Sequence, residues 1–166
     1  MKYNRDYDLR ERILFNQPFD KDNNAHFNEE YKASQERGDS VAEQSSIFSK
    51  YYVGGCRRFD KITVNQLKEL LDANFIDGSQ SQNGSPTVNE FLKFGMKMQC
   101  SDKYTLVYYE GYAISPDRDD YRVSIDGIKF ESEYVIDREV LSAFWKFIQY
   151  ASEVEISDTR GRGWWD

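Results

Sequence analysis

The stretch Tyr121-Arg-Val-Ser-Ile-Asp-Gly-Ile-Lys-Phe-Glu-Ser132 decides the fold. Apolar and polar side chains alternate in its first half, so that Tyr121, Val123 and Ile125 share one face of an extended chain. In its middle, Asp126-Gly127 is the dipeptide most typical of a two-residue hairpin turn. The pattern therefore predicts two antiparallel strands, 121–125 and 128–132, joined at Asp126-Gly127.

The flanking segments extend this prediction into a sheet with a covering helix. Tyr104–Ile114 is rich in β-branched and aromatic residues, and a polar turn after Pro116 separates it from the next strand. We expect a three-stranded antiparallel meander. Residues 137–151 carry an apolar stripe at helical spacing that should lie on the sheet, and 154–156 could add a final strand.

The region before the meander has the signals of helices. Ser40 with Glu43 has the spacing of a capping box, Thr63 is an expected N-cap for a helix ending near Asn74, and Ser85-Pro86-Thr87 is expected to start another. We therefore expect an α+β fold in which N-terminal helices pack with a small antiparallel meander that a C-terminal helix covers. Residues 1–38 are expected to form a polar arm and 39–166 a single domain.

Composition and charge exclude several classes of protein. Aromatic residues make up 16% of the 166 residues, which is typical of a chain with a folded core, and the apolar runs are far shorter than the roughly 20 residues of a membrane span. The net charge is −7, and residues 101–166 hold 14 acidic and 8 basic residues. Because direct nucleic-acid binding usually needs a basic stripe, we expect neither nucleic acid nor membrane as a partner. The acidic balance either aids solubility or forms a face for a basic, nucleic-acid-binding protein.

Few residues could carry cofactor or metal chemistry. Cys56 and Cys100 are too few for a disulfide framework, and with His26 as the only histidine there is no metal-ligand spacing. We expect no metal, no cofactor and a cytoplasmic protein. Arg57 and Arg58 beside Cys56 could lower the pKa of its thiol, so a reactive Cys56 stays open as an alternative.

The expected hairpin after Glu110 concentrates charges and tyrosines. Tyrosine and arginine are enriched at binding hot spots, which favours a recognition hairpin over the alternative of a stiff turn with local ion pairs. The candidate partner-binding residues here are Glu110, Tyr112, Asp117, Arg118, Asp119, Asp120, Tyr121 and Arg122.

The C-terminal pair Trp164-Trp165 is a second candidate. Two bulky apolar rings there either fold back onto the sheet or dock to a partner or a second copy of the chain. Arg160 and Arg162 are separated by glycines, which would let this tail approach closely and stack a guanidinium on a ring.

The segment Glu110–Ile128 contains Gly-Tyr-Ala-Ile-Ser-Pro-Asp-Arg-Asp-Asp-Tyr-Arg-Val-Ser-Ile-Asp-Gly-Ile. With Phe75-Ile-Asp77, Asn83-Gly-Ser-Pro86 and the terminal Trp-Trp-Asp, it resembles an uncharacterised group of small acidic accessory proteins of phages and mobile elements of gut bacteria. The resemblance covers residues from about 59 to 166 and implies no catalytic residues. It implies inhibition of a host defence complex through tight protein binding.

These observations predict a non-enzymatic protein-binding module with an acidic, aromatic surface, in its narrower form an inhibitor of a bacterial defence or nucleic-acid-processing complex. One alternative is a small enzyme with an unrecognised site at Glu110, Asp119 or Cys56. The other is a structural homo-oligomer in which the tail with Trp164 and Trp165 is the interface.

Overall fold

The computed structural model describes residues 1–166 and contains six helices and five strands. In chain order the elements are α1 (Tyr7–Phe15), α2 (Asn23–Arg37), α3 (Val41–Phe48), β1 (Cys56–Thr63), α4 (Val64–Asp72), α5 (Val88–Ser101), β2 (Thr105–Ile114), β3 (Val123–Ser132), α6 (Arg138–Ile148), β4 (Glu153–Ile156) and β5 (Arg160–Trp164).

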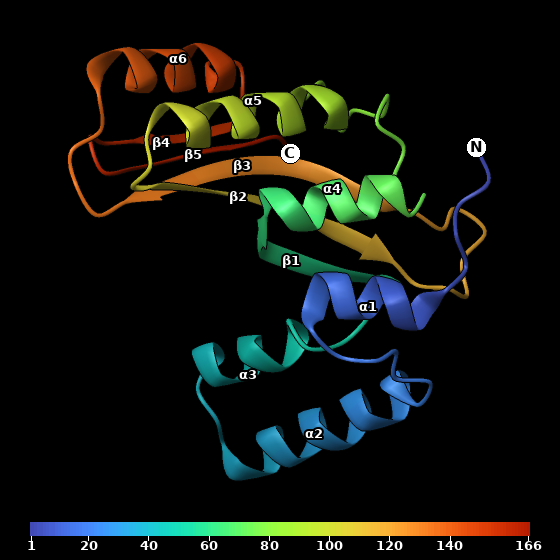
Figure 1. Ribbon diagram of the computed structural model, residues 1–166. Coiled ribbons are helices and arrows are strands. Elements are labelled where there is room, and N and C mark those ends of the chain that lie inside the picture. The colour runs from blue at the N-terminus through green and yellow to red at the C-terminus, as the bar shows by residue number, and fades with distance from the viewer.

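The five strands form one antiparallel sheet in the order β1-β2-β3-β5-β4. The expected α+β fold, with helices first and a C-terminal helix on the sheet, is confirmed (Figure 1). Two strands were not expected. In β1 the charges Arg57-Arg58 and Asp60-Lys61 interrupt the apolar pattern, and β5 is the tail, which inserts between β3 and β4.

The predicted turn at Asp126-Gly127 is wrong. Strand β3 runs through both residues, and residues 115–122 connect it to β2. Glu110 pairs with Gly127 and Gly111 with Ile125, so that Asp126 is the extra residue of a bulge. A Cβ at Gly127 would lie 2.4 Å from Cγ of Glu110. The glycine is therefore required by the close approach of the Glu110 side chain and not by a turn.

Helices α4, α5 and α6 lie on one face of the sheet, where Figure 1 shows α5 and α6 side by side. The fully buried Leu67 of α4, Phe91 of α5 and Phe144 of α6 join the core that these helices form with β2 and β3. Helix α6 approaches β5 so closely that Cβ atoms at Gly161 and Gly163 would meet Phe144 and Ile148. The alternation Arg-Gly-Arg-Gly-Trp thus turns the glycines toward α6.

The helix starts follow the sequence closely. Ser40, Thr63 and Thr87 each accept a hydrogen bond from the backbone amide three residues later, and the glutamate or glutamine at that position bonds back to the cap residue. Asp137 caps α6. These reciprocal bonds satisfy amides that the first helical turn would otherwise leave without partners.

The N-terminal residues pack on the body, whereas α2 and α3 form a separate lobe. Ile13 and Leu14 of α1 belong to the main core. In the lobe, α2 and α3 pack together around their own aromatic rings, which are Phe27, Tyr31, Phe48 and Tyr51. The segment 1–38, expected as a polar arm, therefore contains two helices, and the expected boundary after residue 38 falls between α2 and α3.

Candidate functional site

The face of the sheet opposite α4, α5 and α6 carries none of these helices, and we call it the open face. Residues that pair across neighbouring strands share a face, so the registers define its members. They are Arg58 and Thr63 of β1, Leu106, Tyr108, Glu110 and Tyr112 of β2, Ser124, Lys129 and Glu131 of β3, Glu153 and Glu155 of β4, and Arg160, Arg162 and Trp164 of β5. Lys61 and Asp126, which the registers leave unpaired, belong to the same face through their ion pairs with Glu131 and Arg58.

Glu110 is the centre of one ion-pair network on the open face. Its carboxylate is buried and accepts hydrogen bonds from Arg162, whose Nε lies 2.9 Å from Oε2. Nη1 of Arg162 also donates to Glu153 at 2.9 Å, and Nζ of Lys129 lies 3.9 Å from Glu110. The hydrogen bond to Glu110 is the main reason why the pKa of Arg162 is raised. This network ties the four strands β2, β3, β4 and β5 together.

A second network surrounds Trp164. Arg58 donates to both carboxylate oxygens of the buried Asp126 at 3.0 Å each, which is the strong bidentate geometry. The guanidinium carbons of Arg58 and Arg162 lie 5.9 and 5.4 Å from the ring centre of Trp164, within the range of cation–π contacts. The expected stacking of an arginine on a ring of the tail is present in this contact.

The open face has no surplus of negative charge. Four of its five acids, Glu110, Asp126, Glu131 and Glu153, are each paired with a cation of the same face, and its five acids are matched by five cations. The acidic surplus of residues 101–166 therefore does not collect here, and the face combines paired charges with aromatic rings.

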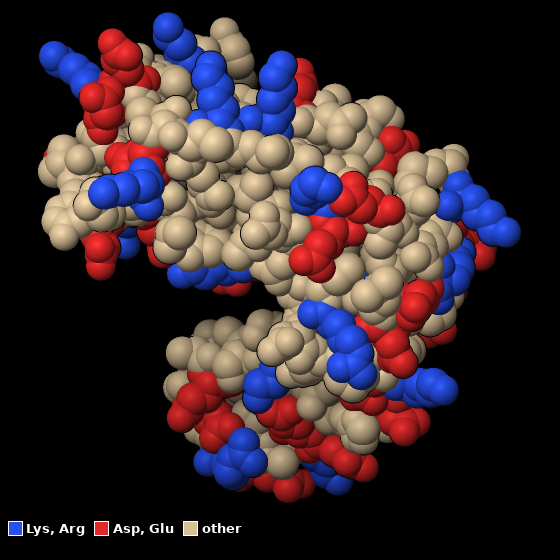
Figure 2. All heavy atoms as spheres, viewed as in Figure 1, with Lys and Arg blue, Asp and Glu red and all other residues tan.

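One end of the open face is apolar and hollowed. Leu106 is 53% exposed, and next to it the exposed rings of Tyr104 and Tyr134 meet edge to face at 4.8 Å. A groove of about 390 Å³ runs between β3, β5 and β4 past Arg160 and Arg162, and a second of about 330 Å³ continues it to Tyr104 and Leu106. In Figure 2 the molecule is also hollowed between the sheet body and the lobe of α2 and α3.

The connection between β2 and β3 presents the acidic part of the predicted hairpin. Asp117, Arg118, Asp119 and Asp120 are all exposed. Arg118 donates two hydrogen bonds of 2.7 Å to Asp120, and this pair lowers the pKa of the Asp120 carboxyl. Arg122, half-buried, donates through Nε to Ser124 and so joins the connection to the open face.

Besides Glu110, two more of the predicted surface residues are buried. Tyr121 is 2% exposed and lies under the N-terminal segment, with the guanidinium carbons of Arg5 and Arg10 at 4.3 and 4.6 Å from its ring centre. Trp165 is 3% exposed and packs edge-on against Phe91 on the helix-covered face. The ten predicted residues therefore lie in three places: Glu110, Tyr112 and Trp164 on the open face, Asp117–Asp120 and Arg122 in the connection, and Tyr121 and Trp165 inside.

Several residues of the open face are not among the ten predicted partner-binding residues, notably Arg58, Lys61, Leu106, Tyr108 and Lys129. The period-two alternation of β2 already places Leu106 and Tyr108 on the same face as Glu110 and Tyr112. For Arg58 and Lys61 the signal is weaker, because a register shift between Phe59 and Ile62 breaks the alternation of β1.

A buried polar cluster lies where the lobe joins the body. Arg10 is fully buried, and its Nη2 donates to Oε1 of Glu11 at 3.1 Å and to the hydroxyl of Tyr52 at 2.7 Å. The Tyr52 hydroxyl donates to the same Oε1, and Arg57 lies 3.9 Å from the other oxygen of Glu11. Burial is the main reason why the pKa of Tyr52 is raised, so it stays a donor. Arg10, Glu11 and Tyr52 bond mainly to one another, although Nε of Arg10 and Oε2 of Glu11 have no hydrogen-bond partner, and this arrangement fits a structural joint.

The cysteines and the histidine, considered above for reactive or metal-binding roles, do not lie together in one site. Cys56 is half-buried at the start of β1, and Cys100 is exposed. His26 is exposed and bonded to Asp20 at 2.8 Å, which raises its pKa. No group of three or more histidine, cysteine, aspartate or glutamate side chains is arranged to hold a metal ion.

Comparison with known proteins adds no relative. The chain matches no protein-family model, no curated protein and no solved structure. None of the six helices combines the length and the apolar character of a membrane span.

Proposed function

We propose that this chain is a protein-binding module whose partner docks on the open face. The observation that carries the proposal is a sheet face without helices that displays Leu106, Tyr108, Tyr112 and Trp164 beside arginines held in ion pairs. Tyrosine, tryptophan and arginine are the residue types most enriched at binding hot spots. The arginines are fixed by Glu110 and Asp126, so little side-chain entropy is lost when a partner covers them.

A protein partner fits this face better than a nucleic acid does. Cations and anions are balanced on it, with Arg58, Lys61, Lys129, Arg160 and Arg162 opposite Glu110, Asp126, Glu131, Glu153 and Glu155. Binding to a phosphate backbone needs an excess of cations, whereas paired charges around an apolar end are typical of protein interfaces. The narrower form of the proposal, inhibition of a bacterial defence complex, rests on the resemblance of residues 59–166 alone.

The experiment compares partner capture by three forms of the tagged full chain in extract of the native host. The form Leu106→Ser/Tyr108→Ala removes apolar contacts from the open face. The matched form Val41→Ser/Met96→Ser removes exposed apolar side chains elsewhere. We expect the wild type and the matched form to retain the same protein and the open-face form to lose it, with melting temperatures nearly unchanged.

Three results would overturn the proposal. The first is equal capture by all three forms. The second is loss of capture after nuclease treatment, which would make the ligand a nucleic acid. The third is loss of capture only in a fourth form tested beside them, Asp119→Lys/Asp120→Lys, which would place recognition in the connection between β2 and β3.

A further inference from the structure

The outer side of the molecule, away from the open face, has a groove between α5 and α6. It measures about 560 Å³ and is closed at one end by Gly84, Ser85 and Pro86. Its floor is aromatic: the rings of Phe94 and Phe147 stack at 4.2 Å with 10° between their planes, and Trp165 lies beside them. The rings of Phe94 and Phe147 are half-buried, and such rings on the floor of a groove are suited to receiving an apolar side chain.

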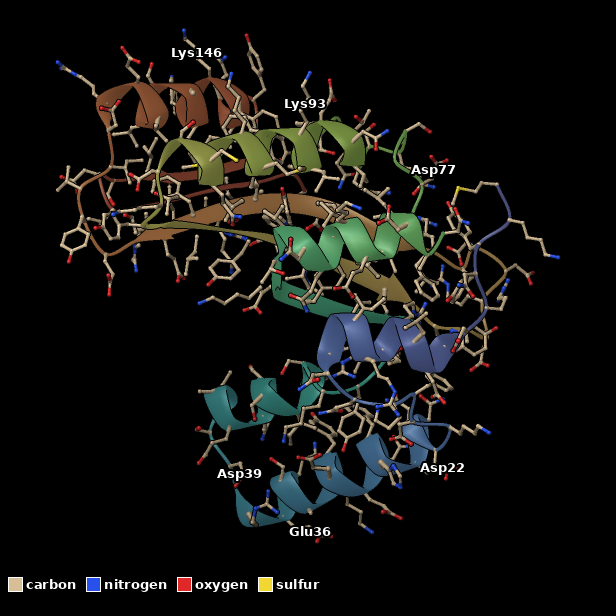
Figure 3. The ribbon with its side chains drawn as sticks, viewed as in Figure 1. Asp22, Glu36, Asp39, Asp77, Lys93 and Lys146 are labelled. Atoms are coloured by element: carbon tan, nitrogen blue, oxygen red, sulfur yellow. The ribbon has the colours of Figure 1, made fainter.

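Three lysines surround this aromatic floor. Lys93 and Lys97 stand one turn apart on α5, and Lys146 stands on α6. Figure 3 shows Lys93 and Lys146 on the same outer side of the molecule. All three are exposed and none forms an ion pair, whereas the acid in the groove, Glu90, is engaged in capping Thr87.

Helix stability does not account for the two lysines of α5, whereas Lys146 stands in the last turn of α6, where a cation is favourable. Like charges four residues apart, such as Lys93 and Lys97, oppose helix formation rather than favour it. The chain as a whole carries a net charge of −7, yet the rim of this groove holds three cations and one acid. The acidic side chains of the lobe, among them Asp22, Glu36 and Asp39, lie at the other end of the molecule (Figure 3).

We propose that the groove between α5 and α6 binds an acidic segment of a partner protein that carries an aromatic or aliphatic anchor. The anchor lies on Phe94 and Phe147, and its flanking carboxylates meet Lys93, Lys97 and Lys146. Lysine suits this task because its compact charge on a flexible stem follows carboxylates of varied geometry. Residues from Glu90 to Lys97, about two turns of α5, line the groove, which gives room for a short length of chain. This site lies on the opposite side of the sheet from the open face and does not depend on the function proposed for that face.

The probe is a fluorescein-labelled synthetic peptide in which glutamates flank one phenylalanine and one leucine. Its binding to the full chain is followed by fluorescence anisotropy at low and at high salt. We expect saturable binding that weakens with salt and falls at least about tenfold in Lys93→Glu/Lys146→Glu, since two rim charges are reversed. The matched control is Lys21→Glu/Lys32→Glu in the lobe, which changes the net charge equally and should leave the affinity unchanged.

Four outcomes would overturn this proposal. The first is the absence of saturable binding by the wild type, and the second is an equal loss of affinity in the groove and lobe variants. The third is undiminished binding of a peptide in which the two apolar residues are serines. The fourth is displacement of the labelled peptide by a single-stranded oligonucleotide at a lower concentration than by the unlabelled peptide. The first three exclude recognition by this groove, and the last makes it a nucleic-acid site. The open-face variant Leu106→Ser/Tyr108→Ala should bind the peptide like the wild type.

Discussion

Arg162 on β5 reaches diagonally across β3 to the carboxylate of Glu110 on β2, and the absence of a side chain at Gly127 makes room for this contact. Glu110 pairs with Gly127, and Arg162 pairs with Lys129 two residues farther along β3. The side chain of Glu110 therefore lies over Gly127, and its Oε2 is 2.9 Å from Nε of Arg162. One bulge, one glycine and one ion pair together fix the register in the centre of the sheet.

Removing the guanidinium of Arg162 should show how much its ion pair with Glu110 contributes to the free energy of unfolding. In Arg162→Met the carboxylate of Glu110 stays buried with only Lys129, at 3.9 Å, as a nearby cation. An unpaired buried charge is costly, so we expect the free energy of unfolding to fall by about 3 kcal/mol. Urea unfolding of Arg162→Met measures this, and Arg160→Met, an exposed neighbour on the same strand, is the control. Equal effects of both substitutions would show that the ion pair between Arg162 and Glu110 contributes nothing to stability.

Gly127→Ala should be destabilising only while Glu110 is present. The new methyl group would lie 2.4 Å from Cγ and 2.8 Å from Cδ of Glu110, so the side chain must leave its place beside Arg162. We expect a loss of about 2 kcal/mol in the wild type, and a much smaller loss in a Glu110→Ala background, where the clashing atoms are gone. Unfolding of the four proteins of this cycle gives the coupling energy. Additive effects would mean that the glycine serves another purpose.

Most of the fold could be predicted from local signals, because capping boxes and apolar periodicity act within a few residues. Thr63 and Thr87 start their helices as expected, and the period of two identifies β2. The role of Gly127 could not be predicted, since Asp-Gly favours a hairpin locally and only the side chain of Glu110, 17 positions earlier, requires a glycine within a strand. Here a tertiary contact overrides local turn propensity.

The site was predicted only in part for a related reason. Glu110, Tyr112 and Trp164 were identified from composition and do lie on one face. Tyr121 shares the alternation of Val123 and Ile125, which face the core, and Arg5 and Arg10 from the N-terminal segment cover it, a contact between residues more than 100 positions apart. Alternation identifies the two faces of a strand, and it does not identify the segment that covers one of them.

The buried pair of Arg10 and Glu11 should be essential for stability. Arg10 donates to Glu11, to Tyr52 and to the backbone oxygen of Ile114 at 2.9 Å, and it is fully buried. Arg10→Met leaves the carboxylate and the carbonyl without this donor, and we expect a loss of about 3–5 kcal/mol. Arg12→Met, exposed on the same helix, should change stability by less than about 0.5 kcal/mol.

The double variant Arg10→Met/Glu11→Leu separates a buried charge from a general packing defect. With both charges replaced by apolar side chains, the buried carboxylate is gone and only the half-buried Arg57, 3.9 Å from Glu11 in the wild type, loses an ionic partner. The double variant should therefore be more stable than Arg10→Met alone. Thermal and urea unfolding of the three proteins measure the difference. A double variant less stable than either single variant would show that the hydrogen bonds, and not the charge balance, hold this joint.

Stability should fall steeply in alkaline solution. Burial raises the pKa values of Tyr52 and Tyr109 above the usual value near 10, and the hydrogen bond to Glu30 raises that of Tyr51 to about 12. Above pH 10 the unfolded chain releases these protons whereas the folded chain keeps them. The unfolded state then binds fewer protons, so the free energy of unfolding is fully retained below about pH 10 and decreases above it, by about 1.4 kcal/mol per pH unit for each such tyrosine.

Urea unfolding between pH 8 and pH 11, compared for the wild type and Tyr109→Phe, measures the slope. The free energy of unfolding of Tyr109→Phe should decline less steeply with pH, by the slope that one fewer released proton gives. Identical slopes would mean that Tyr109 ionises freely in the folded protein.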